Sequence, residues 1–561
     1  MDDADVGSST SAASASHQSH GFRIRGVAEW CGGGAVAQGG WTLEHRKKLL
    51  ELMYRKDCNL YLLLPQRGAG GGGRKGVSTE NQEGWVKEVG ELIAFSKAKK
   101  VDVNVGFVLD VNERNKKEQA KKEAETLAPL AELVGVLSEK GCRHFSLFFE
   151  PFSLPSTATT TTTTTPTTST TPSEASVASV QATLANNLLA EVKKTLAAAH
   201  KDKEFSNQRW YLHTKPLFAT PKPKKPQALA ATPQHQPPPQ EHKRVMDYWR
   251  ELDKSLEDKF FLLFDGFSVS PSDEGVDRNS DETILQLWQP PQLSQQSQQQ
   301  RRHKLVVLEG FPANSIPPDV YHASSTARSP ASTIPNLHPY NGRQPALEKS
   351  VEGLLLKFDS RKLAPCSSLV PLCTAFDFLR FPYAYNPSIS LTAALVDLFE
   401  DDRAAEDMTQ LISLAPLVSP EGKVVPFEGD PIKMKKLSTE SFFTGVSSKI
   451  ALARKDCQST SKDLNEELKP FFEVLETFVA MNTLAFQMNA MIESKNKKKG
   501  GGGGDQKQKV SSVSKWWADY NDLKKKFTDI QRKLDELLNP VYSGEVLNAT
   551  TSELSELYLF G

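Results

Sequence analysis

GCRHFSLFFEPF, residues 141–152, is the stretch of sequence that decides the fold. A glycine that closes a helical pattern is followed by a short apolar and aromatic run, and the run stops at the acid Glu150. Such a run is typical of a buried parallel strand, and in an α/β barrel the residue just past a strand lies at the open end. We therefore expect residues 144–149 to form a strand that presents Glu150 at the mouth of a barrel.

The alternation of a short apolar run with an amphipathic helix repeats along most of the chain. Strands are expected at 22–28, 59–64, 101–109, 144–149, 209–213, 260–264, 304–308 and 353–356. Helices are expected at 43–55, 83–97, 121–140, 177–199, 245–256, 282–288 and 369–378. Eight strands alternating with helices favour a (β/α)8 barrel, and a doubly wound open sheet is the alternative.

Beyond residue 386 only helices are expected. Residues 464–494 carry a near-heptad apolar stripe, and residues 514–538 carry a second one that includes the pair Trp516 and Trp517. Two such helices predict an antiparallel helical bundle. We interpret the tryptophan pair as a core anchor of this bundle, and a peptide-binding or sugar-binding platform is the alternative.

Composition shifts divide the chain into three parts. We expect a disordered tail, a barrel and a helical C-terminal region, at 1–20, 21–387 and 388–561. Low-complexity insertions rich in Thr, in Pro, Lys and Gln, in Gln, and in Lys and Gly lie at about 157–173, 221–240, 289–300 and 495–512. These segments cannot bury enough apolar surface to offset the entropy of ordering, so each is expected to be a mobile loop.

The global composition excludes several classes of function. The 68 basic residues balance 68 acidic ones, so net charge does not favour nucleic acid or an anionic membrane as a partner. The sequence has no membrane-length apolar stretch and no secretory signal pattern, which predicts a cytoplasmic or nuclear protein. The six cysteines lack Cys-x-x-Cys spacing and the Gly-rich segments lack phosphate-loop spacing, so we expect no metal and no cofactor.

Several motifs resemble, in the same order, the O-GlcNAcase family of β-N-acetylglucosaminidases, glycoside hydrolases once called hyaluronidases. The motifs are GVAE at 26–29, WTLEHRKKLLELM at 41–53, NLYLLLP at 59–65, GCRHFSLFFEPF at 141–152, LHPYNGRQPALEKSVEGLL at 337–355 and FPYAYNP at 381–387. The resemblance covers about 21–387 and implies a (β/α)8 barrel followed by a helical bundle. It also implies an O-GlcNAc-type glycan or a glycoprotein as the partner.

The resemblance implies substrate-assisted hydrolysis by two neighbouring carboxylates. The 2-acetamido oxygen of the substrate attacks the anomeric carbon, one carboxylate orients the acetamido group, and the other protonates the leaving oxygen. In the family an Asp-Asp pair that ends the fourth strand supplies both groups, and here the pair is Glu150-Pro151. Pro151 has no titratable group, so a proton transfer that typically contributes about 10²- to 10⁴-fold is missing.

Other positions that the resemblance marks as sugar-binding have also changed. Gln66 stands where the family presents a lysine, and the expected tyrosine falls near Pro216. The expected Asn and Asp after the seventh strand correspond to Gly310 and Ser315, and a further Asn falls near Leu369. This loss at many positions indicates a non-catalytic relative.

Glu29, at the end of the first strand, is grouped with Gln66 as a candidate substrate-binding residue. Three hypotheses follow for the whole chain. The first is a pseudo-glycosidase that binds a glycan, or a protein through its C-terminal helices. The second is an active β-N-acetylglucosaminidase in which Glu150 works with Asp265 or Glu309 as the replacement acid, although acids at strand ends are also common as ion pairs or helix caps. The third is a scaffold whose Thr-, Pro- and Gln-rich loops carry the function.

Overall fold

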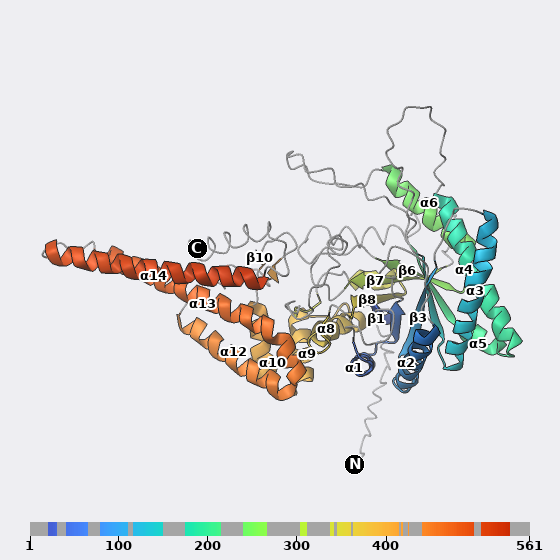
Figure 1. The fold of residues 1–561 in the computed structure, drawn as a ribbon, viewed down its shortest axis with the longest axis horizontal. Coiled ribbons are helices and arrows are strands. Elements are labelled where there is room, and N and C mark those ends of the chain that lie inside the picture. The colour runs from blue at the N-terminus through green and yellow to red at the C-terminus, as the bar shows by residue number, and fades with distance from the viewer. Residues whose placement is uncertain are drawn as a thin grey trace, which may run out of the picture.

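A computed structural model describes residues 21–30, 41–64, 79–109, 116–149, 174–214, 239–265, 303–310, 337–340, 345–360, 363–414, 417–418, 424–425, 440–498 and 506–538. Over these residues the chain forms a closed barrel of parallel strands, surrounded by helices and followed by a helical region (Figure 1).

Eight strands make up the barrel in the order of the sequence. They are β1 (Ile24–Trp30), β2 (Leu60–Leu64), β3 (Asp102–Leu109), β4 (His144–Phe149), β5 (Arg209–His213), β6 (Phe260–Asp265), β7 (Leu305–Gly310) and β8 (Gly353–Asp359). Strand β8 pairs in parallel with β1, which closes the barrel and rules out the open-sheet alternative. The predicted (β/α)8 barrel is therefore confirmed. Several strands run further than predicted, because their last residues are polar or glycine and do not extend the apolar run.

Helices on the outer side of the barrel connect the strands. They are α1 (Leu43–Arg55), α2 (Thr79–Ala98), α3 (Lys116–Glu139), α4 (Glu174–Ala198), α5 (Asp202–Asn207), α6 (Pro239–Ser255) and α8 (Leu369–Arg380), with a 3-10 turn η3 (Pro345–Lys349). Helix α1 begins where predicted because the Thr42 hydroxyl accepts from the His45 backbone N–H, and the His45 ring accepts from the Thr42 N–H. The helix predicted at 282–288 lies outside the described residues.

The strand side chains alternate between two apolar layers. Ala28, Leu62 and Leu308 belong to a small cluster inside the barrel. Val27, Tyr61 and their equivalents on the other strands belong to the large outer layer that packs against the helices. A period of two along each strand therefore decides whether a residue faces the interior or the helices.

The amino-terminal end of the barrel is closed by polar contacts between neighbouring strands. The His144 Nε2 atom lies 3.2 Å from an Asp102 carboxylate oxygen, and the Nδ1 atom lies 3.2 Å from the Tyr211 hydroxyl. One step further in, the Ser146 hydroxyl donates to the Asn104 side-chain oxygen at 2.8 Å. These contacts fill the end of the barrel opposite to the mouth.

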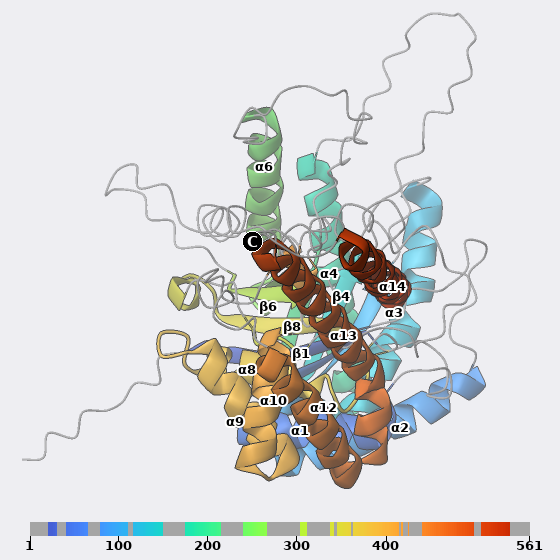
Figure 2. The ribbon, with the colours of Figure 1, turned by 90° about the vertical axis from the view of Figure 1, so that its left-hand side faces the viewer.

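The C-terminal region is helical, as predicted. It comprises α9 (Pro387–Phe399), α10 (Asp402–Leu414), α12 (Glu440–Thr460), α13 (Lys462–Lys498) and α14 (Gln506–Leu538), with a short antiparallel pair β9 (Leu417–Val418) and β10 (Val424–Val425) that was not predicted. Helix α13 packs against both α12 and α14. The hairpin of α13 and α14 projects away from the barrel (Figure 1), and Figure 2 views the molecule from the side on which the hairpin projects.

One carboxylate joins the helical region to the barrel. Glu467 of α13 accepts hydrogen bonds from the backbone N–H of Ser367 at 2.7 Å and of Cys366 at 3.1 Å, just before α8. Burial and the nearby Glu467 charge together raise the pKa of the Cys366 thiol to about 12. Glu467, in the second turn of α13, therefore ties that helix to the turn that precedes α8.

Candidate functional site

The candidate site is the mouth of the barrel, where the strands end at their carboxyl termini. Strand β4 ends at Phe149, so Glu150 and Pro151 are the first two residues after it. Glu150, Pro151 and Gln66 themselves lie outside the described residues. The surroundings of the site are therefore described through the residues next to these three positions.

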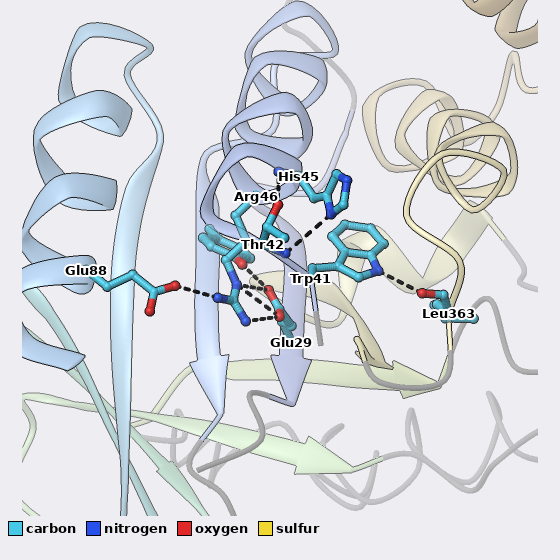
Figure 3. A network of polar contacts seen from close by, with 8 residues as sticks. Glu29, Trp41, Thr42, His45, Arg46, Glu88 and Leu363 are labelled. Atoms are coloured by element: carbon cyan, nitrogen blue, oxygen red, sulfur yellow. Dashed lines mark hydrogen bonds and ion pairs between the residues drawn. The ribbon is translucent and has the colours of Figure 1, made fainter. Parts of the chain in front are cut away.

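Glu29 lies in the outer wall of the barrel rather than in its interior. Its position alternates with the inward Ala28, and its side chain is fully buried between β1 and the helices. The Arg46 Nε donates to both carboxylate oxygens at 3.1 Å, and Nη2 donates to one of them at 2.7 Å. The Tyr61 hydroxyl of β2 also donates to this carboxylate. Figure 3 shows the Arg46 guanidinium facing this carboxylate.

Arg46 extends the same network to α2. Its Nη1 donates to the Glu88 carboxylate at 2.7 Å, so one guanidinium bridges Glu29 and Glu88 (Figure 3). Burial raises the pKa of Glu88, and the positive charge of Arg46 opposes this shift. Nearby, the Trp41 indole N–H donates to the Leu363 carbonyl at 2.8 Å. The network fixes α1 and α2 against β1 and gives Glu29 a structural role, while its part in substrate binding stays a prediction.

Glu309 is also on the helix-facing side of its strand. It follows the inward Leu308, and its carboxylate accepts a hydrogen bond from the Tyr340 hydroxyl at 2.8 Å. Tyr340 is held in turn, because its backbone N–H donates to the Thr374 hydroxyl at 2.9 Å and its carbonyl accepts from the Tyr385 hydroxyl at 2.5 Å. These contacts agree with the alternative that Glu309, as an acid at a strand end, has a structural role.

Asp265 is the last residue of β6, and its backbone is in register with Leu308 of β7. Its side chain is not among those that the structure describes. The backbone thus places Asp265 at the mouth, and its part in any chemistry remains a hypothesis.

Two basic residues that sequence reasoning missed occupy inward positions near the mouth. His213, the last residue of β5, shares the inward side with Tyr211, and its ring stacks on Phe148 with the centroids 4.9 Å apart. Lys357 of β8 shares the inward side with Leu355 and is only partly buried. Counting every second residue along RWYLH and GLLLKFD would have found both. Both side chains therefore lie on the inward side of their strands near the mouth.

A buried polar cluster fixes the end of β5 beside His213. The Thr214 hydroxyl donates to the Gln181 side-chain oxygen of α4 at 2.7 Å, and the Tyr248 hydroxyl of α6 donates to the same oxygen. All three side chains are buried. The backbone that carries His213 is therefore held by two helices.

The described residues contain no group of three or more His, Cys, Asp and Glu side chains that could hold a metal ion. Separately, none of the helices within the described ranges has the length and apolar character needed to span a bilayer.

Comparison with known proteins shows the fold. No protein-family model and no curated protein sequence matches the chain. Among solved structures, a point mutant of the O-GlcNAc hydrolase of Thermobaculum terrenum superposes with a TM-score of 0.52 at 15% identity, covering 95% of this chain and 94% of that one. A second structure, CpGH84B, gives a TM-score of 0.53 at 13% identity, covering 95% and 77%. The resemblance expected from the motifs is therefore confirmed at the level of the fold, and it extends over the helical region.

Proposed function

We propose that this protein is a catalytically inactive relative of the β-N-acetylglucosaminidases, which binds a glycan or a glycoprotein at the barrel mouth without hydrolysing it. The observation that carries the proposal is the end of β4 at Phe149. It supports the expectation, drawn from the motifs, that Glu150 and Pro151 stand where the resembled family has its two carboxylic acids. Proline can neither donate nor accept a proton, so the general acid is missing at its expected position.

The described acids near the mouth do not replace it. Glu29 is enclosed by Arg46 and Tyr61, and Glu309 is bonded to Tyr340, both on the helix-facing side. A general acid must reach the leaving oxygen within hydrogen-bonding distance, which these two carboxylates cannot do from behind the strands. His213 and Lys357 place polar side chains at inward positions of β5 and β8 near the mouth, which supports binding without turnover.

The second candidate function is an active β-N-acetylglucosaminidase that removes O-linked GlcNAc from proteins. In this account Glu150 orients the acetamido group and Asp265 donates the proton. The observation in its favour is the position of Asp265 at the end of β6, on the same edge of the barrel as the end of β4. Glu309 is the weaker candidate for the acid, because its carboxylate accepts a hydrogen bond from the Tyr340 hydroxyl.

The proposed location of the protein is the cytoplasm or the nucleus. The described cysteines, Cys58, Cys142, Cys366, Cys373 and Cys457, are all free thiols. Free thiols without disulfides suit a reducing compartment.

Binding and turnover are tested separately on the full-length protein. A GlcNAc-oxazoline mimic should raise the melting temperature of the native protein, while an aryl N-acetyl-β-glucosaminide should release no aryl group. Lys357→Met should lose the thermal shift, whereas Lys304→Met, which alters an exposed lysine before β7, should keep it. No thermal shift with the native protein would contradict glycan binding, and aryl release would favour the active enzyme.

A further inference from the structure

A cavity of about 400 Å³ lies among the helices on the outer side of the barrel, where α8 and α9 face α1. Its apolar lining includes Leu52 of α1, Val370 of α8, and Ala394 and Leu398 of α9. The first three of these side chains are buried, and Leu398 is half-buried. The volume falls in the range typical of small-molecule sites, roughly 300–1,000 Å³. The cavity therefore suits a small ligand with an apolar part.

The charged side chains that line the cavity leave one positive charge in excess. Among the described residues, the cations of the lining are Lys48, Arg55 and Lys99, and the acids are Glu51 and Asp397. The Lys99 Nζ atom lies 2.8 Å from a Glu51 carboxylate oxygen. The Nζ atom of Lys56, which is not part of the lining, lies 3.9 Å from a carboxylate oxygen of Asp397. Both acids of the lining are therefore already paired.

Lys48 and Arg55 are the two cations of the lining that remain. Neither forms a hydrogen bond or an ion pair with any residue that the structure describes. Both are exposed, and they stand seven residues apart on α1, so they share one side of the helix. The hydrogen bond from Lys99 and, to a lesser degree, the charge of Arg55 lower the pKa of Glu51, so this acid stays ionised at neutral pH. The rim of the cavity thus offers two cations to an anionic group.

We propose that this cavity binds a small carboxylate with an apolar chain, of the kind found in medium-chain fatty acids. The carboxylate lies against Lys48 and Arg55 at the rim, and the chain packs on Leu52, Val370 and Leu398. A single negative charge matches the excess of one positive charge, whereas a phosphate monoester carries about −1.5 to −2 at pH 7. The proposal does not depend on glycan binding at the barrel mouth.

The apolar chain and the carboxylate contribute to binding in different ways. Burial of the chain supplies most of the affinity, because an ion pair at an exposed rim contributes little. The charge instead selects an anion over a neutral or cationic molecule with the same chain. Exposed ion pairs of this kind correspond to a discrimination of about twofold to fivefold in the dissociation constant.

The test is isothermal titration calorimetry of the full-length protein with octanoate, and octanol and octylammonium serve as probes of the same chain length. Lys48→Glu/Arg55→Glu reverses both free cations of the cavity. Lys193→Glu/Lys203→Glu is the matched double reversal, at exposed positions of α4 and α5 outside the cavity. Leu398→Asn removes part of the apolar wall. Circular dichroism checks that each variant keeps its helices.

Octanoate should bind the native protein about twofold to fivefold more tightly than octanol, and octylammonium should bind more weakly than both. Lys48→Glu/Arg55→Glu should invert this order, and the matched double reversal should keep it. Leu398→Asn should weaken the binding of octanoate and octanol alike. The proposal is overturned if octanoate does not bind, if octanoate and octanol bind equally, or if the cavity variants bind the probes as the native protein does. Loss of the order in the matched double reversal overturns it as well.

Discussion

Arg46 holds the fully buried carboxylate of Glu29 through two of its guanidinium nitrogens and bridges it to Glu88 of the next helix. The acid that ends the first strand is thus committed to joining β1, α1 and α2. Glu309, on β7, is similarly committed to Tyr340. Both of these strand-end acids support the wall of the barrel.

Arg46→Met should destabilise the protein strongly, because it leaves the Glu29 carboxylate buried without its counter-ion. Breaking a buried pair in this way typically costs about 3–5 kcal/mol in the free energy of unfolding. Urea denaturation measures the change. Lys47→Met, which removes the partner of the exposed Glu44, is the control and should cost about 0–1 kcal/mol. Equal effects of the two substitutions would contradict the role assigned to Arg46.

Glu309→Gln should leave binding of the GlcNAc-oxazoline mimic unchanged, because the side chain faces Tyr340 behind the strand. The substitution weakens a single hydrogen bond, so the free energy of unfolding should fall by about 0.5–1.5 kcal/mol. Thermal shift with and without the mimic checks both effects. A lost response to the mimic, with the fold retained, would place Glu309 in the site after all.

Asp102→Asn should reduce the sensitivity of the protein to acid. Burial raises the pKa of Asp102, but the hydrogen bond and charge of His144 outweigh burial and hold the pKa below its ordinary value of 3.8. A lowered folded-state pKa means that the ion pair stabilises the fold above the ordinary value and that this contribution disappears as the pH falls through the lower one.

Denaturation between pH 5 and 2, a range chosen around that ordinary value, should therefore show a shallower loss of stability in Asp102→Asn than in the native protein. Asp247→Asn, on the exposed face of α6, is the matched control. Identical pH profiles for native protein and Asp102→Asn would contradict the pairing of Asp102 with His144.

Glu467→Ala should loosen the junction between barrel and helical region. The carboxylate accepts hydrogen bonds from the backbone N–H groups of Cys366 and Ser367, and a hydrogen bond to a charged group typically contributes about 1.5–3 kcal/mol. Hydrogen exchange of these two amides should accelerate. Glu466→Ala, at the exposed neighbouring position, should change neither the free energy of unfolding nor the exchange rate of these amides. Unchanged exchange in Glu467→Ala would show that other contacts hold the junction.

The sequence predicted those elements whose apolar pattern is bounded by clear signals. Strand β5 and helix α1 were predicted to the residue, at 209–213 and 43–55, because polar residues or a capping box enclose them. Helix α14 begins at Gln506 rather than near residue 514, since its first turns consist of helix-forming Lys and Gln without an apolar stripe.

The candidate site was harder to predict than the fold. Glu29 was expected to bind substrate because the sequence does not reveal that Arg46, seventeen residues later, meets it behind the strand. His213 and Lys357 were missed because each interrupts an apolar run that was interpreted as core. Strand parity would have separated inward from outward residues, but the partners of each side chain come from distant helices and only the folded structure brings them together.

Release of an aryl group from an N-acetyl-β-glucosaminide, compared between the native protein and Glu150→Gln, tests the central claim most directly. Because the protein lacks a general acid at the expected position, neither protein should release the aryl group above background. Pro151→Asp should gain activity if the rest of the mouth still binds the sugar. Release by the native protein that disappears in Glu150→Gln would contradict the claim and show an active glycosidase.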